Sequence, residues 1–181
     1  MEEKTNSIWK SGFIYGAILG LIMIIYTVLL YVMDQSFNRF LPYLNYVFLA
    51  IIVFYGAKSY RDNSLDGFIN YGRALGISMI IVGVAAIISS VYFFVHISVV
   101  DTEYVTKLLM TVEEGMLEKG MPDDQIEMAV SVQKKMMKPG ILSVLSFLGI
   151  AFWGLVISLI TSIFVKKQGD PYQEAMQDIE E

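Results

Sequence analysis

The chain has no cysteine and only one histidine among its 181 residues. Without cysteine, disulfide bonds and thiolate metal sites are excluded, although the compartment is not revealed. The single histidine, His96, does not make a metal site by itself, since the other ligands would have to come from elsewhere in the fold. We therefore expect no metal ion and no cofactor.

Charge is scarce and is missing from four long stretches. Charged residues make up 17% of the chain, against about 25% in a soluble domain. Runs of 22, 18, 27 and 26 residues contain no Asp, Glu, Lys or Arg, and they cover 12–33, 40–57, 74–100 and 140–165. A helix needs about 20 residues to cross a bilayer, and these runs are apolar on all sides rather than striped. They predict four transmembrane helices.

The order of these runs predicts an all-α membrane protein. The first run is longer than the about 7–15 residues of a signal-peptide core and lacks a small-x-small cleavage site, so we interpret it as a retained span. Residues 34–39 are the only link to the second run and impose an antiparallel hairpin. We expect a single domain over 1–167, an antiparallel four-helix transmembrane bundle, and a disordered acidic tail at 168–181.

The only sizeable region outside the spans is 101–139, which predicts a helical hairpin between the third and fourth spans. Gly120 ends the first helix, and Pro122 followed by two acidic residues starts the second. Five lysines against eight acids give this region a net charge of −3. An acidic exterior argues against nucleic acid as a partner, because phosphate binding needs clustered Lys and Arg. The lipid bilayer and a protein bound through the hairpin are the expected partners.

Loop charges favour cytoplasmic termini. In that orientation seven Lys and Arg lie inside and six lie outside. The inside residues sit in short segments close to span ends, where the positive-inside rule weights them most. Lys134, Lys135 and Lys138, beside the fourth span, are the main evidence against this orientation.

Small residues recur at helical spacing and are the candidate packing positions. They are Gly12, Gly16 and Gly20 in the first span, Gly76 and Gly83 in the third, and Gly154, Ser158 and Ser162 in the fourth. Without a Cβ, helices approach closely and gain packing energy in lipid. We interpret these faces as contacts within one chain; homodimerisation through the first span is the alternative.

Chemistry-bearing motifs are absent from the sequence. It contains no Gly-rich phosphate loop, no His-Glu-x-x-His and no Gly-x-Ser-x-Gly. His96 lies about one turn from the end of the third span, where we interpret it as an interfacial histidine; a proton relay or ligand site is the alternative. We expect a protein that is not an enzyme.

Four segments in order resemble a known family. They are Trp9–Gly16, Asp66–Gly76, the helix pair split at Gly120-Met-Pro122, and Gly154–Lys167. Together they are similar to the bacterial membrane family called domain of unknown function 4199. The resemblance implies a small four-span protein of the bacterial inner membrane, and it implies no activity.

The leading functional hypothesis is a non-enzymatic scaffold or accessory subunit. It rests on the close-packing faces and on the one hairpin available to a partner. A small oligomeric transporter or channel is the alternative, since four spans need symmetry to enclose a pathway. A lipid-modifying enzyme built on Arg61, Asp62, Asp66 and Arg73 is a third possibility, although solvated helix ends explain these residues.

Overall fold

The computed structural model describes residues 7–167. Within that range the chain is all-helical, with six α-helices, two short helical segments and no strand beyond one isolated β-bridge. The predicted tail at 168–181 lies outside the described residues. The elements in order are α1 (Ile8–Val32), η1 (Leu41–Tyr43), α2 (Leu44–Ser64), α3 (Tyr71–Val95), η2 (His96–Val100), α4 (Tyr104–Leu117), α5 (Asp123–Met136) and α6 (Pro139–Val165).

Four helices are long and apolar enough to cross a membrane: α1, α2 with η1, α3 with η2, and α6. Their ends differ slightly from the uncharged runs, because helices continue into polar sequence. The clearest case is α2, which extends past Ala57 to Ser64 and so carries Lys58 and Arg61 in its last turns. Basic residues suit a helix C-terminus, where they face the unpaired carbonyls.

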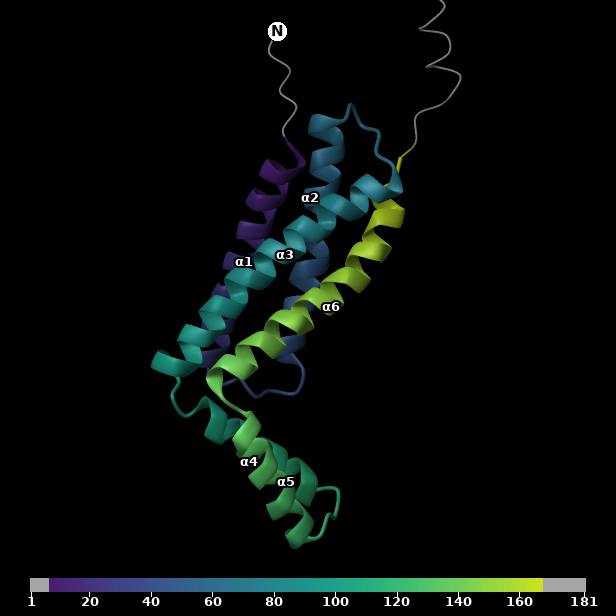
Figure 1. The fold of residues 1–181 in the computed structure, drawn as a ribbon. Helices are drawn as coiled ribbons and strands as arrows, with labels where there is room; N and C mark the ends of the chain where they lie inside the picture. Colours follow the sequence, from purple (N-terminus) through teal and green to yellow (C-terminus); the bar gives the residue numbers. More distant parts are fainter. Residues whose placement is uncertain (1–6, 168–181) are drawn as a thin grey trace, which may run out of the picture.

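The four long helices lie side by side, with α3 packed against α1, α2 and α6 (Figure 1). The core is drawn largely from α3, which contributes eight buried residues. The outward sides of the long helices expose large apolar side chains instead, such as Leu21, Phe152 and Phe164. The long helices therefore bury only a narrow seam, which is the line of contact between α3 and its neighbours, and they present an apolar outer surface.

At one end of the long helices, hydrogen bonds of backbone and side-chain groups join the α2–α3 connection to α6. Ile69 and Lys167 exchange two backbone hydrogen bonds of 2.8 and 3.0 Å. The guanidinium of Arg61 donates to the carbonyl oxygen of Val165 at 3.0 Å, which caps the last turn of α6. The side chain of Asn70 accepts from the backbone of Arg73 at 2.8 Å and caps the start of α3. The α2–α3 connection is therefore fastened to the end of α6.

The hairpin of α4 and α5 extends from the opposite end (Figure 1). Gly120 has φ +71° in the turn between the two helices, a conformation that favours glycine. Pro122, with extended backbone, precedes α5, and two acids fill its first turn. The signals for this hairpin thus act as expected from the sequence, and its two helices pack against each other.

Candidate functional site

β-Branched side chains of α3 pack directly against the glycines of α1. A Cβ at Gly12 would overlap the side chain of Ile80, and a Cβ at Gly16 would lie 2.6 Å from the Cβ of Val84. At Gly20 it would lie 3.0 Å from Ile88. Both series step by four residues in the same direction, so the two helices run parallel and interlock one turn at a time.

The small-residue face of α6 meets α3 from another side. A Cβ at Gly154 would overlap the side chain of Val82. Ser158 and Ser162, one and two turns further on, are fully buried. The hydroxyl of Ser162 donates to the carbonyl oxygen of Ser158 at 2.6 Å. Such a bond within the helix lets serine replace glycine at a close contact.

The two predicted glycines of α3 differ from this pattern. A Cβ at Gly83 would meet nothing within 4 Å, so Gly83 packs against no helix in this structure. Gly76 makes only ordinary contact, 3.7 Å from Ile8. In α3 the large side chains make the close contacts with α1 and α6, and Gly76 and Gly83 lie outside these contacts. Gly56 of α2 was not predicted, although a Cβ there would lie 2.6 Å from Ile81; an isolated glycine carries no spacing signal.

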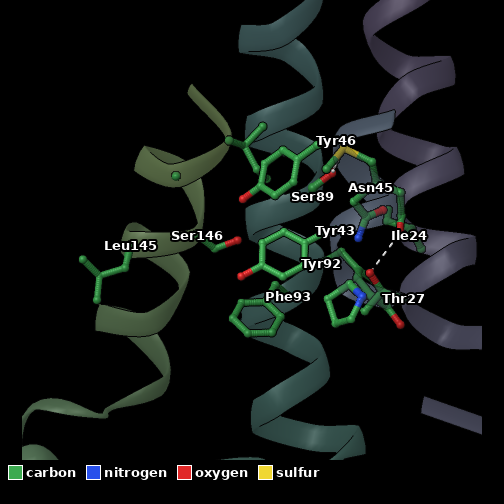
Figure 2. Close-up of a pocket in the computed structure, with 14 residues that line it drawn as sticks. Ile24, Thr27, Tyr43, Asn45, Tyr46, Ser89, Tyr92, Phe93, Leu145 and Ser146 are labelled. Atoms are coloured by element: carbon green, nitrogen blue, oxygen red, sulfur yellow. Dashed lines mark hydrogen bonds between the residues drawn. The ribbon is translucent and has the colours of Figure 1, made fainter. Parts of the chain in front are cut away.

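A cavity of about 340 Å³ lies among α1, the start of α2, α3 and α6 (Figure 2). Fourteen residues line it, none of them charged. Seven carry a hydroxyl or an amide: Thr27, Tyr43, Asn45, Tyr46, Ser89, Tyr92 and Ser146. This volume falls at the small end of the roughly 300–1,000 Å³ typical of ligand sites. No spacing in the sequence links Asn45 to Ser89, because only the fold brings them to one cavity.

His96, at the end of α3, is buried among side chains of the protein. Only 3% of the residue is exposed. Its Nδ1 lies 3.2 Å from the hydroxyl of Tyr92, and its ring packs edge-on to Tyr31 with centroids 4.9 Å apart. His96 follows the buried Ser89 by seven residues, so α-helical spacing places it on the buried face of α3, and the short π-helix η2 begins at this residue.

The joint between η2 and α4 holds an ion pair between a buried aspartate and a partly exposed lysine. Asp101 is 4% exposed and accepts from the ammonium of Lys107 at 3.3 Å. That hydrogen bond raises the pKa of Lys107, and the charge of Asp101 adds to the effect. Burial raises the pKa of the neighbouring Tyr104, whose ring packs on Phe93. These contacts fasten the hairpin to α3, so they explain the position of α4.

Within residues 7–167, no group of three or more His, Asp or Glu side chains could hold a metal ion. Arg61 and Asp62 do form an ion pair of 2.7 Å at the other end of the molecule. Arg61 also caps α6, so this pair has a structural role.

Six helices, four of them of membrane-spanning length and apolar, define an all-helical protein with a small uncharged cavity. The profile of the family described as "Protein of unknown function (DUF4199)" matches residues 14–167. The chain belongs to this family, which confirms the resemblance found in the sequence. No curated protein matches the chain, and no solved structure does.

Replacing Gly16 with leucine tests the contact between α1 and α3. We expect Gly16→Leu to lower stability by about 1–3 kcal/mol or more, because the Cβ would also lie 2.9 Å from the backbone oxygen of Ile81, which cannot rotate away. Gly83→Leu is the matched control and should lose no stability. Thermal unfolding of the purified variants measures both. If Gly16→Leu unfolds like the control but loses oligomers, the glycine face belongs to a homodimer.

Proposed function

We propose that the protein is a non-enzymatic scaffold or accessory subunit of the bacterial inner membrane, with four transmembrane helices in an antiparallel bundle. The apolar outer surface of the long helices supports membrane insertion. Phe152 is 61% exposed and Phe164 is 70% exposed. A soluble monomer rarely exposes such continuous apolar surface, whereas lipid would cover it.

The observation that carries the scaffold role is an unpartnered apolar stripe on α5. The side chains of Met128, Val132 and Met136 follow one another at spacings of four and are 71%, 50% and 62% exposed. They point away from the face that packs on α4, which includes the buried Ile126. A second apolar face on a two-helix hairpin suits a partner helix, and methionine adapts readily to such a contact.

Charge supports an orientation with cytoplasmic termini. Six basic residues of the described chain lie at the end where α1 and α3 begin: Lys10, Lys58, Arg61, Arg73, Lys166 and Lys167. They sit within a few residues of the helix ends, where the positive-inside rule applies. The lysines of the hairpin are spread over a segment with more acids than bases. The hairpin would then project outside the cytoplasm.

The transporter alternative has weaker support. The cavity offers polar side chains, but it lies in one half of the long helices and is also lined by Ile24, Phe93 and Ile150. A conducting path would have to cross the other half, where α3 interlocks with Gly12 of α1 and Gly154 of α6. Solute flux in liposomes that contain only this protein would favour the transporter over the scaffold.

Crosslinking from α5 tests the scaffold role. A photoreactive residue at Val132 should give a protein adduct of defined mass in native membranes. Ser131, which directly precedes Val132 and lies on the polar side of α5, is the matched control. Met128→Glu should abolish the adduct without unfolding the exposed helix surface. Adducts to lipid alone, or the same adducts from both positions, would contradict a partner site on this stripe.

Cysteine labelling tests the orientation, because the natural chain has none. We expect Ser131→Cys to react with a membrane-impermeant maleimide in intact cells. Asn63→Cys, at the end of α2, should react only after the membrane is permeabilised. The reversed pattern would place the hairpin in the cytoplasm, and reaction of both in intact cells would rule out a sealed four-span insertion.

A further inference from the structure

A large aromatic side chain is held outward where α2 connects to α3. The backbone turns at Asp66 and Gly67, whose φ angles are +50° and +84°. Ile69, two residues further on, is 2% exposed and forms an antiparallel β-bridge with Lys167. Successive side chains of an extended segment point to opposite sides, so the burial of Ile69 directs Phe68 outward, where 43% of it is exposed. The backbone therefore fixes the exposure of this ring.

A lysine ammonium lies over the same ring. The Nζ of Lys167 is 5.4 Å from the centroid of the Phe68 ring, within the range of a cation–π contact. The backbone of Lys167 is held by its two hydrogen bonds to Ile69, so the ammonium and the ring stay together. At the surface of a bilayer an aromatic ring lies at the level of the head groups, and a lysine side chain reaches toward them.

This end of the long helices carries positive charge that the described acids do not balance. The acids near it are Asp62 and Asp66, and Asp62 is already paired with an arginine at 2.7 Å. Within residues 7–167, three exposed basic side chains at this end form no ion pair: Arg73, Lys166 and Lys167. An anionic group would therefore be attracted to this surface.

We propose that the surface formed by Phe68, Lys166 and Lys167, here called the lysine corner, binds the phosphate of an anionic phospholipid. The ring of Phe68 would lie against the upper part of the acyl chains. The proposal rests on the membrane placement proposed above, but not on the scaffold role. A zwitterionic phospholipid would bring its own ammonium group to the same positive surface, which disfavours it. A soluble phosphate would leave the exposed ring without an apolar partner.

Lipid binding by the full chain tests the lysine corner. The protein in neutral detergent is titrated with phosphatidylglycerol or with phosphatidylcholine of the same acyl chains, and native mass spectrometry counts the bound lipids. We expect the first phosphatidylglycerol to bind about tenfold more tightly, and the preference to shrink as the ammonium acetate concentration is raised. Soluble glycerol phosphate at the same concentration should not displace it. Equal binding of the two lipids, or displacement by glycerol phosphate, would overturn the proposal.

Charge-matched variants locate the site. Lys166→Gln combined with Lys167→Gln should lower phosphatidylglycerol binding to the level of phosphatidylcholine. Lys134→Gln combined with Lys135→Gln removes the same charge from the last turn of α5, in the hairpin at the opposite end, and should leave the preference unchanged. Phe68→Ser keeps every charge and should weaken phosphatidylglycerol binding about threefold through the lost apolar contact.

The two lysine pairs also give the outcome that contradicts a defined site. Equal losses from both double variants would show charge attraction spread over the protein, and would overturn the proposal. Thermal unfolding of each variant checks that it is folded. A cysteine pattern that contradicts membrane insertion defeats the membrane placement itself, whereas a missing lipid preference in a correctly inserted protein defeats the lysine corner alone.

Discussion

The structure depends on the close approach of α3 to its neighbours, made possible by glycines facing β-branched side chains. Val84 lies over Gly16 of α1, and Val82 lies over Gly154 of α6. In lipid the hydrophobic effect does not hold helices together, so van der Waals packing and hydrogen bonds between helices must do so. The same seam leaves the outer surfaces free to be apolar. Removal of one Cβ at each contact therefore supports the arrangement of all four long helices.

The position of the cavity follows from this packing. Gly12, Gly16 and Gly20 draw the first part of α1 against α3, and Gly154 does the same for the later part of α6. Beyond these contacts, toward the hairpin, Gly149 of α6 faces open space. Tyrosines and Asn45 of α2 line the same cavity as Gly149. Tight packing in one half of the long helices thus coexists with a small polar cavity in the other half.

Much of the fold could be predicted from the sequence, because charge exclusion and helix signals are local. The four apolar helices and the turn at Gly120 depend on neighbouring residues alone. Glycines spaced by four in α1 predict a face, but not its partner, because all the other long helices also contain Val and Ile residues. The spacing of seven residues between Gly76 and Gly83 does not reveal which face of α3 meets a neighbouring helix. The sequence therefore predicted a close contact at Gly83 that the structure does not show. The burial of His96 depends on neighbours such as Tyr31 of α1, and the cavity beside Asn45 depends on three other helices.

The features on which the proposals rest lie in two parts of the molecule. The long helices and their connections carry the packing seam, the cavity and the lysine corner, while the hairpin carries an exposed apolar stripe around Val132. The ion pair of Asp101 and Lys107 lies at the joint between them. In the scaffold role proposed above, this joint would connect a partner on the hairpin to the long helices.

The most direct test of the central packing claim is a double-mutant cycle on Gly154 and Val82, because the three atoms nearest to the missing Cβ all belong to Val82. Gly154→Ala, Val82→Ala and the double variant would be compared by thermal unfolding in one detergent. The packing account predicts that the double variant is more stable than Gly154→Ala, since the shorter side chain at 82 makes room for the new methyl group. Losses that simply add would contradict it.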